Sequence, residues 1–516
     1  MNQTKLIKAM KSMKVDPYLD SIVDYNPALD ADSYKVSMPW QYPANTTRIH
    51  TYVEARGSIS KPSDAIIASL ANYMSPEMVK VFVAENTYQP FDRTVMFGLQ
   101  YIAIKYLGTK ITATMVKKAR QQWTDHGMPF NYDGWMRIVT DFDGYLPLRV
   151  RAVPEGTVVP LRNALITIEN THDDFAWLVT HFETMLLRVW YPITVATLSA
   201  SVRKIVKKYL EETADNLDGL NFKHHDFGAR GVSSLESAAL GGAAHLAAGS
   251  WGSDTMSAIL LLQNYYAADT MPAYSIPAME HSTVTSWTRD LEVEAYRNMI
   301  RQYSKPGKIF AIVIDSYNYR RAIEIFGTVL KDELIASGGT LVLRPDSGTP
   351  KDVVLEVVEL AAKYFGYTIN TKGYKLLPSY IRVIQGDGIT LESIPGILEN
   401  LKVNGWSTDN LALGQGGGLL QMVNRDTLQF ACKCSAALID GTYVDVYKDP
   451  IGDSGKRSKR GIQNLYRHKV TGEFATLRVE QADLTQYEDA MVTIFENGTI
   501  MNMSDLDEVR ARSSKF

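Results

Sequence analysis

The sequence predicts an α/β protein with an irregular (β/α) barrel-like domain and a second α+β domain formed by N-terminal and C-terminal segments. Short apolar runs separated by helical stretches fill residues 309–413. Alternation of apolar and polar residues, typical of strands, occurs near both chain ends, at 48–56 and 442–447. We place the barrel-like domain at residues 170–430 and the second domain at 1–169 together with 431–516.

Four apolar runs in the barrel-like domain each predict a buried strand. They are Ile309–Ile314 before Asp315, Thr340–Leu343 before Arg344, Tyr380–Ile384 before Gln385, and Asn410–Leu413 before Gly414. A helical stretch separates each run from the next. Strands that alternate with helices in this way form a parallel sheet or an α/β barrel.

The clearest helix is predicted over Pro350 to Tyr364. Thr349 can cap it, Pro350 suits the first helical position, and Asp352 completes a capping-box pattern. Valines and an alanine at helical spacing make its apolar stripe, and Gly366 can end it.

The segment from Arg48 to Arg56 predicts a strand of the second domain. Its residues alternate with a period of two, which places Ile49, Thr51 and Val53 on one face. A second alternating stretch runs from Thr442 to Tyr447, before a basic loop.

Composition excludes several classes of protein. Hydrophobic residues make up 45% and charged residues 22% of the 516 residues, as in ordinary globular proteins. The net charge of −3 gives no basic field for nucleic acid. We find no apolar run long enough to span a bilayer, and residues 1–18 are too polar for a secretory signal. We therefore expect a cytoplasmic protein that binds neither nucleic acid nor membrane.

The predicted strand ends carry polar and glycine residues. In parallel α/β folds the active site lies at the carboxyl ends of the strands. Here those ends read Arg-Pro-Asp-Ser-Gly at 344–348, Gln-Gly-Asp-Gly at 385–388 and Gly-Gln-Gly-Gly-Gly at 414–418. The last run can turn several backbone N–H groups toward one phosphate, although glycine runs also occur at tight turns.

Three acids follow successive predicted strands: Asp315, Asp346 and Asp387. Such carboxylates can chelate Mg²⁺ or hold sugar hydroxyls, and the alternative is that they cap turns. Their positions after successive strands favour a functional role, because active-site residues of such folds commonly lie at these strand ends.

Basic residues and one histidine complete the candidate site. Lys433, Lys448 and Lys456 follow the glycine run, and a basic loop spans 455–461; its alternatives are a solvated charge run or a nucleic-acid patch. His281 lies next to Glu280, and an imidazole oriented by a carboxylate can act as a base or as a phosphate acceptor. Both roles stay open at this point.

Many motifs in one order resemble the nicotinate/nicotinamide phosphoribosyltransferase family of type II phosphoribosyltransferases. The segments that carry the resemblance are Asp32–Val36, Gln41–Pro43, Tyr191–Thr197, His225–Gly228, Arg230–Ser234, Gly252–Thr255, Ser275–Thr283, Arg344–Gly348, Val383–Gly388, Gly416–Gln421, Arg425–Asp426, Lys448–Pro450 and Lys456–Lys459. The resemblance implies transfer of phosphoribosyl from phosphoribosyl pyrophosphate to nicotinamide, which gives nicotinamide mononucleotide and pyrophosphate in NAD salvage.

The resemblance also implies a base site. Phe227 and Tyr34, the latter from a partner subunit, would stack on the two faces of nicotinamide. Asp254 would accept the carboxamide N–H₂ and repel the carboxylate of nicotinate. Arg230 and Ser275 would border the base and the ribose.

For the sugar, the resemblance implies that Asp346 and Asp387 hold the ribose hydroxyls, with Mg²⁺ near the pyrophosphate, and that Arg344 neutralises that pyrophosphate. The phosphate groups would be bound by a set of cations and backbone groups drawn partly from the partner of a homodimer: Arg56, Gly386, Gly416, Gly417, Arg425, Lys433, Lys448 and Lys456. His281 would be phosphorylated by ATP, with Glu280 and Asp315 orienting it.

Three positions depart from the family pattern. Ala431 and Gln415 stand where relatives carry serine, and Ala229 replaces a tyrosine. Smaller residues near the 5′-phosphate leave space for an alternative donor, ADP-ribose pyrophosphate, which would give NAD directly. Two further alternatives are a nicotinate phosphoribosyltransferase, against which Asp254 argues, and a binding protein that has lost its activity.

Overall fold

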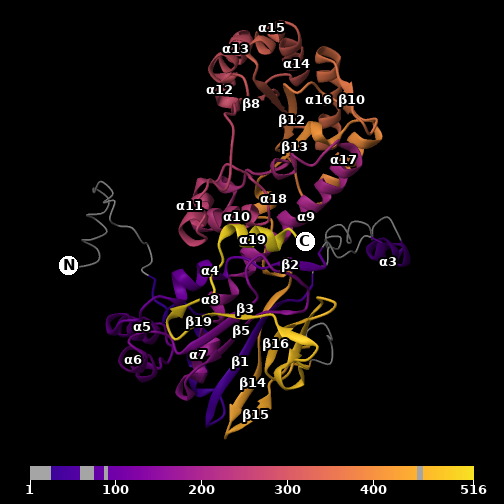
Figure 1. Cartoon of the computed structure of the whole chain (residues 1–516). Helices are drawn as coiled ribbons and strands as arrows, with labels where there is room; N and C mark the ends of the chain where they lie inside the picture. Colours follow the sequence, from indigo (N-terminus) through magenta and orange to yellow (C-terminus); the bar gives the residue numbers. More distant parts are fainter. Residues whose placement is uncertain (1–24, 58–74, 86–90, 450–456) are drawn as a thin grey trace, which may run out of the picture.

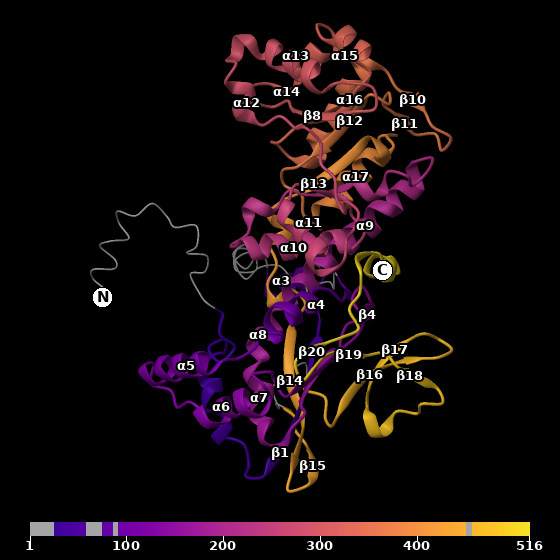
Figure 2. The same ribbon diagram turned by 60° about the vertical axis from the view of Figure 1, so that its left-hand side comes forward.

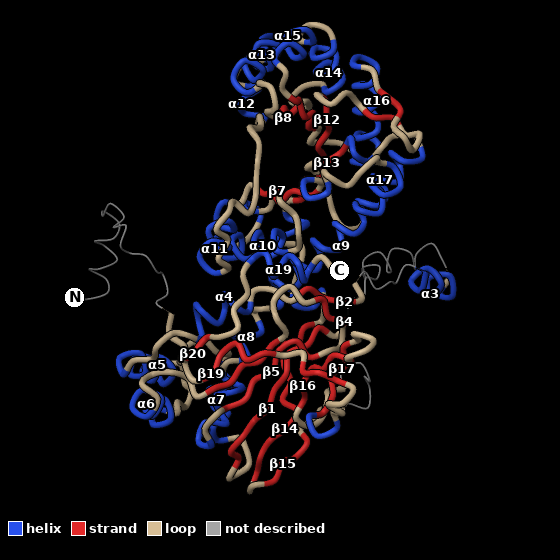
Figure 3. Tube along the Cα trace, in the orientation of Figure 1, coloured by secondary structure: helices blue, strands red, loops and turns tan. Residues whose placement is uncertain are grey.

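Two large sheets organise the chain. The computed structural model describes residues 25–57, 75–85, 91–449 and 457–516. A parallel sheet lies in the upper part of Figure 1 and an antiparallel sheet in the lower part. Helices surround the upper sheet, whereas the lower sheet carries strands from both ends of the chain (Figure 3).

The upper sheet has six parallel strands, and their order departs from the chain order. That order is β7 (Gly252–Ser253), β6 (His224–Asp226), β13 (Leu411–Gln415), β12 (Ile381–Gln385), β9 (Thr340–Arg344) and β8 (Ile309–Val313). The four predicted strands of this region are confirmed as β8, β9, β12 and β13. All carboxyl ends face one edge, because every pairing is parallel.

An extended segment, residues 274–279, bridges the two outer strands of this sheet. The N–H of Ser253 donates to the carbonyl of Tyr274 at 3.2 Å, next to β7. On the other side, the N–H of Ala311 in β8 donates to Pro277, and the N–H of Met279 donates to Ala311, at 2.9 and 3.0 Å. The curled sheet thereby becomes an irregular barrel, which confirms the predicted fold class.

Helices of the upper part cover the outside of the sheet. They are α9 (Trp190–Thr213), α10 (Leu235–Ala247), α11 (Met256–Tyr265), α12 (His281–Thr285), α13 (Glu292–Tyr303), α14 (Tyr319–Gly327), α15 (Lys331–Ser337), α16 (Pro350–Phe365), α17 (Ser393–Val403) and α18 (Gly417–Leu420). The apolar faces of α13 to α17 and the strands enclose a separate hydrophobic core that includes Phe310, Leu341 and Val383. Helices α10, α11 and α18 instead bury their apolar residues in the core that extends into the lower part.

Helix α16 confirms the predicted helix over 350–364 and corrects its capping. Thr349 is the N-cap, but its side chain makes no capping bond; the carbonyl of Thr349 instead accepts the N–H of Asp352 at 3.0 Å. The predicted capping box is therefore wrong. Gly366 follows the helix with a φ of 78°, a conformation that glycine adopts without strain.

The lower sheet has seven strands. Their order is β15 (Thr442–Asp445), β14 (Phe430–Ile439), β1 (Thr46–Ala55), β5 (Ala164–Asn170), β3 (Leu148–Ala152), β19 (Val492–Glu496) and β20 (Thr499–Ile500). Strand β1, predicted over 48–56, lies between β14 and β5 and is buried on both faces from Ile49 to Ala55. The predicted strand is confirmed, and both of its faces are covered because α7 (Ala176–His181) and β16 (Gln463–His468) pack against it.

Smaller elements complete the lower part. A three-stranded sheet of β17 (Phe474–Arg478), β16 and β18 (Tyr487–Asp489) stands at its side in Figure 2. One short pair joins β2 (Arg93–Val95) to β4 (Val158–Pro160). A second pair, β10 (Thr368–Ile369) with β11 (Lys375–Leu376), belongs to the upper part, beside α16 (Figure 2). The remaining helices are α3 (Pro76–Glu85), α4 (Leu99–Ile102), α5 (Ala113–Asp125), α6 (Tyr132–Asp141), α8 (Glu183–Leu187) and α19 (Leu506–Ser513).

One helical stretch corrects an expectation about apolar length. Residues Glu183–Thr213 are long and apolar enough to cross a membrane by length and composition, and 78% of the most apolar window is buried inside the protein. Core helices of globular proteins share these properties, so the stretch is weak evidence for a membrane span.

Two neighbouring residues of α15 test the upper core. Leu334 is fully buried, whereas Ile335 is 47% exposed. We expect Leu334→Ala to lower the free energy of unfolding by about 2–5 kcal/mol, because it leaves a cavity. Ile335→Ala should change it by less than about 1 kcal/mol. Urea denaturation followed by circular dichroism measures both, and equal losses would contradict this assignment of the core.

Candidate active site

The irregular barrel encloses a cavity of about 400 Å³. Its walls come from the parallel strands and from residues 274–278. Among its lining residues are four that the sequence predicts for the site, namely Phe227, Asp254, Ser275 and Arg344. The convergence of strand ends therefore brings the predicted base and diphosphate residues to one place.

The ring of Phe227 lies directly on the backbone of Gly414. A Cβ atom at position 414 would come within 1.9 Å of the Phe227 ring, and one at Gly386 within 3.3 Å. The N–H of Phe227 also donates to the carbonyl of Gln415 at 3.0 Å. Glycine at 414 is therefore required for the ring to lie against β13, with its edge next to β12.

Asp254 follows β7 and has its carboxylate beside Ser275. The Ser275 hydroxyl donates to Oδ1 of Asp254 at 2.7 Å, and the Asp254 side chain is otherwise exposed to the cavity mouth. Since Ser275 belongs to the bridging segment, the closure of the barrel orients this acid.

A buried acid that the sequence analysis missed holds the base site together. Asp226 accepts hydrogen bonds from the Ser253 and Thr255 hydroxyls at 3.0 and 2.7 Å, and from the N–H of Gly228 at 2.8 Å. Burial raises the pKa of Asp226, and these hydrogen bonds oppose that effect. Asp226 thus fixes the loops that present Phe227 and Asp254. Its position next to Phe227 at a strand end was the available signal.

His281 is paired with Asp315. Nε2 of His281 lies 2.9 Å from Oδ1 of Asp315, and the carboxylate is nearly buried. Its other oxygen accepts the N–H of Asp346 and the hydroxyl of Ser347, at 3.0 and 2.5 Å. Burial alone would raise the pKa of Asp315, but the hydrogen bonds from Ser347, His281 and Asp346 outweigh it and lower that pKa. Asp315 therefore stays ionised and orients the imidazole.

Glu280 occupies a different place from Asp315. It is the N-cap of α12 and forms a capping box with Thr283, whose hydroxyl accepts the N–H of Glu280 at 3.2 Å. The Ser282 hydroxyl donates to the Glu280 carboxylate at 3.0 Å. Glu280 hence sets the start of the helix that carries His281, and Asp315 makes the direct contact with the ring.

Arg344, Asp346 and Asp387 form a charged rim above the cavity. Nη2 of Arg344 lies 3.8 Å from Oδ2 of Asp346. Burial raises the pKa of Asp346; Arg344 opposes this, and the nearby charges of Asp315 and Asp387 add to it. A cation bound at this rim would relieve the repulsion among the three acids.

The rim fits a magnesium ion that is shared with a substrate. Among the described residues, no group of three or more His, Cys, Asp or Glu side chains could hold a metal by itself. Mg²⁺ commonly binds through one or two carboxylates together with substrate phosphates. Asp346 and Asp387 match that donor set when a diphosphate supplies the remaining oxygens.

The glycine run forms a loop between β13 and α18. Gly417 and Gly418 begin α18, and the first N–H groups of a helix have no acceptor within it. A Cβ at Gly231 would lie 3.6 Å from Gly417, so the short helix Ala229–Gly231 packs against this loop and places the exposed Arg230 beside it. Gly416 thereby lies next to the Phe227 backbone, and Gly386 lies next to the edge of the Phe227 ring.

Several other predicted residues lie in the lower part of the structure, near the antiparallel sheet. Tyr34 is 62% exposed on the short helix Ser33–Trp40, which packs against α7. Arg425 pairs with Asp426 at 2.9 Å, and Lys456 lies outside the described residues. The described lining of the cavity includes none of these residues, nor Arg56, Lys433 or Lys448.

Arg56, Lys433 and Lys448 form a cluster of cations on the lower sheet. Burial lowers the pKa of Lys433, and the charges of Arg56 and Lys448 lower it further. Nη2 of Arg56 is buried without a hydrogen-bond partner among the described residues. Two carboxylates balance part of this positive charge: Glu54, which pairs with Arg56 and Lys459, and Glu183, whose charge raises the pKa of Lys433.

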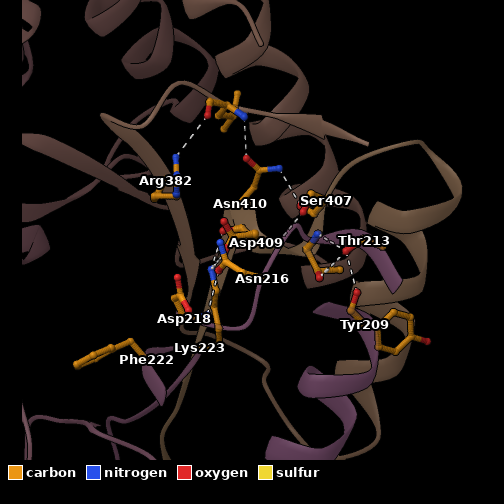
Figure 4. Close-up of polar contacts among 12 residues, drawn as sticks. Tyr209, Thr213, Asn216, Asp218, Phe222, Lys223, Arg382, Ser407, Asp409 and Asn410 are labelled. Carbon is orange, nitrogen blue, oxygen red and sulfur yellow. Dashed lines mark hydrogen bonds and ion pairs between the residues drawn. The ribbon is translucent and has the colours of Figure 1, made fainter. Parts of the chain in front are cut away.

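The far end of the cavity carries charges that the sequence analysis missed. Nζ of Lys223 lies 2.9 Å from Oδ1 of Asp409, and Arg382 and Asn410 line the cavity next to them (Figure 4). Burial lowers the pKa of Lys223, and Asp409 opposes that effect. These residues lie at the amino ends of strands, where no motif drew attention to them.

Comparison with known proteins identifies the family. The model of the nicotinate phosphoribosyltransferase (NAPRTase) family matches residues 222–497, and that of the nicotinamide phosphoribosyltransferase N-terminal domain matches residues 26–150. The chain belongs to the nicotinate phosphoribosyltransferase family. It is therefore a glycosyltransferase of the pentosyltransferase class, which confirms the resemblance and the predicted enzyme class.

Two relatives match most of the chain. A nicotinamide phosphoribosyltransferase of Xanthomonas campestris is 47% identical over 500 residues, covering 96% of this chain and 98% of that protein. One from Acinetobacter baylyi is 33% identical, covering 72% and 76%. Among solved structures, nicotinate-nucleotide pyrophosphorylase from Pyrococcus furiosus (14% identity, TM-score 0.59, 98% of both chains) and human nicotinic acid phosphoribosyltransferase (15%, 0.53, 94% and 93%) share the fold.

The contact between Gly414 and Phe227 gives a direct test. We expect Gly414→Ala to displace the Phe227 ring, because the added methyl group would overlap it. A loss of about 10-fold or more in kcat/KM for the pyridine substrate should follow, equivalent to about 1.4 kcal/mol. Gly396→Ala is the matched control, since no atom lies within 4 Å of its added Cβ. Wild-type kcat/KM in Gly414→Ala would disprove the contact.

Proposed function

We propose that this protein transfers phosphoribosyl from phosphoribosyl pyrophosphate to nicotinamide, giving nicotinamide mononucleotide and pyrophosphate in NAD salvage. The observation that carries the proposal is the position of the Phe227 ring on Gly414, in one cavity with Asp254 and Arg344. The names of the relatives from Xanthomonas and Acinetobacter agree with this choice of base.

The base site favours an amide. A pyridine ring stacks on the free face of Phe227, where offset contact adds to the burial of area. The carboxylate of Asp254 accepts the carboxamide N–H₂, while the Ser275 hydroxyl occupies its other side. Nicotinate would place a second carboxylate against Asp254, so charge repulsion discriminates against it.

The charged rim serves the sugar and the leaving group. Asp346 and Asp387 hold the ribose hydroxyls and Mg²⁺, and Arg344 balances charge that develops on the diphosphate. The C1′–O bond breaks and its electron pair leaves with pyrophosphate. The ring nitrogen of nicotinamide then donates its lone pair to C1′ of the oxocarbenium-like sugar, forming the new C–N bond.

His281 couples ATP to this reaction. Asp315 accepts a hydrogen bond from Nε2–H and orients the ring, which leaves the lone pair of Nδ1 free to attack the γ-phosphate of ATP. The bond between the γ-phosphorus and the bridging oxygen breaks, and its electron pair leaves with ADP. The ring is 43% exposed, so it is accessible to a nucleotide. Glu280 contributes by fixing the start of α12.

A homodimer completes the site. Tyr34, Arg56, Arg425, Lys433 and Lys448 lie away from the cavity of their own chain, and a second copy supplies them. The cations of the lower sheet provide the positive charge that the 5′-phosphate and diphosphate need, together with the basic loop that includes Lys456.

Product mass tests the proposed reaction. With nicotinamide, Mg²⁺, ATP and phosphoribosyl pyrophosphate, we expect nicotinamide mononucleotide and pyrophosphate in equal amounts. ADP-ribose pyrophosphate, for which Ala431 and Ala229 leave space, is the competing donor and would give NAD. Mass spectrometry separates the two products. NAD as the faster product would overturn the choice of donor, and no product from either donor would overturn the activity.

Exchange of Asp254 tests the selection of the base. Asp254→Asn removes the negative charge but keeps the shape, so kcat/KM for nicotinamide should fall about 10- to 100-fold, while that for nicotinate rises. Asp269→Asn, at an exposed position outside the cavity lining, is the control. Steady-state assays with both bases measure the ratio, and an unchanged ratio would remove Asp254 from base selection.

Neutralising Asp315 tests the coupling to ATP. We expect Asp315→Asn to lower the ATP-stimulated rate about 10-fold or more and the rate without ATP by much less, because only the former needs an activated His281. Asp332→Asn, at an exposed position of α15, is the control. Equal losses with and without ATP would contradict this role.

A further inference from the structure

Two glutamines end neighbouring strands directly before the two glycine loops of the site. Gln385 is the last residue of β12 and Gln415 the last of β13, and both side chains are fully buried. Nε2 of Gln385 donates to the carbonyl of Asp387 at 2.9 Å. The Gln385 side chain thereby fixes the loop of residues 386–388 that follows β12. Gln415 occupies the equivalent place beneath the loop of Gly416 to Gly418.

The orientation of the Gln415 amide follows from its neighbour His224. Oε1 of Gln415 lies 2.9 Å from Nε2 of His224. Nδ1 of His224 is buried without a partner among the described residues, so the ring hydrogen lies on Nε2, where it can be bonded. The amide oxygen of Gln415, which only accepts hydrogen bonds, therefore faces His224. The His224 ring is fixed in turn by an edge contact with the buried ring of His245, at 4.8 Å between centroids. The amide nitrogen of Gln415 is thus turned toward the glycine loop.

That nitrogen lies beside Gly418 but has no acceptor among the described residues. Nε2 of Gln415 lies 3.1 Å from the position of a Cβ at Gly418, and it is buried without a hydrogen-bond partner. A buried donor without a partner costs about 1–3 kcal/mol. A small shift of the loop, of the kind that an anion bound to its N–H groups would cause, can bring a loop carbonyl to this donor.

We propose that Gln415 is a positioning residue for the phosphate-binding loop: when a phosphate fills the loop, Nε2 of Gln415 donates to a loop carbonyl, as Gln385 already does for Asp387. The inference rests on the proposed function for the identity of the ligand, a sugar 5-phosphate.

The same residue links the phosphate and base sites. The carbonyl of Gln415 accepts the N–H of Phe227 at 3.0 Å, so the backbone serves the base while the side chain serves the loop. Replacing the side chain leaves that backbone bond in place. A positioning role therefore predicts a loss that is confined to phosphate binding.

Binding of ribose 5-phosphate tests the inference without turnover. We expect Gln415→Met, which keeps the volume but removes the donor, to raise the Kd for ribose 5-phosphate about 3- to 10-fold, the size of one neutral hydrogen bond. The Kd for nicotinamide should change less than 2-fold. Isothermal titration calorimetry on the full protein measures both. Gln415→Leu repeats the test if the methionine variant does not fold.

Gln100→Met is the matched control, because Gln100 is another buried glutamine, bonded to Tyr265 and Ser504 outside the cavity. It should lower the melting temperature without changing the Kd for ribose 5-phosphate. A wild-type Kd in Gln415→Met, or equal weakening of ribose 5-phosphate and nicotinamide, would overturn the inference. Failure of the proposed reaction would show instead as absence of product from the wild-type enzyme, whatever the Kd values are.

Discussion

The extended segment 274–279 is the constraint on which the rest of the site depends. Six parallel strands curl but do not meet, and this segment closes the gap by hydrogen bonding beside β7 on one side and to β8 on the other. Closure encloses the cavity, presents Ser275 to Asp254, and delivers the chain to the start of α12, where His281 meets Asp315. One stretch of backbone thus sets the base site and the candidate phosphate acceptor together.

The shape of the cavity depends on glycines as well as on side chains. Gly414 lets the Phe227 ring lie on β13, and Gly386 leaves room at the ring edge. Buried polar residues then hold the loops: Asp226 fixes those of the base site, and Gln385 and Gln415 lie beneath those of the sugar and phosphate. The exposed groups of the candidate site therefore rest on a layer of buried hydrogen bonds, which is typical of preorganised sites.

The sequence predicted the parts whose signal is local. The apolar runs of β8, β9, β12 and β13 and the helix α16 were found because each has a clear periodicity and a polar end. Strand β7, with two residues, and the segment 274–279 are too short and irregular for any periodicity, so the closure of the barrel was not predictable. Burial of both faces of β1 depends on α7 and β16, far away in sequence. Asp226, Lys223 and Asp409 escaped notice because their importance comes from burial, which only the folded chain reveals.

In the proposed function, the active site combines residues of the barrel with cations of the lower sheet. This combination is the central claim about function. Phe227 belongs to the barrel, whereas Arg56 belongs to the lower sheet and, in the proposed homodimer, comes from a second copy. Mixing two inactive variants, Phe227→Ala and Arg56→Ala, by co-expression tests this most directly. Mixed dimers would contain one site with both native residues, so roughly a quarter of wild-type activity should return with random pairing. Activity no higher than that of the separate variants would contradict a shared site.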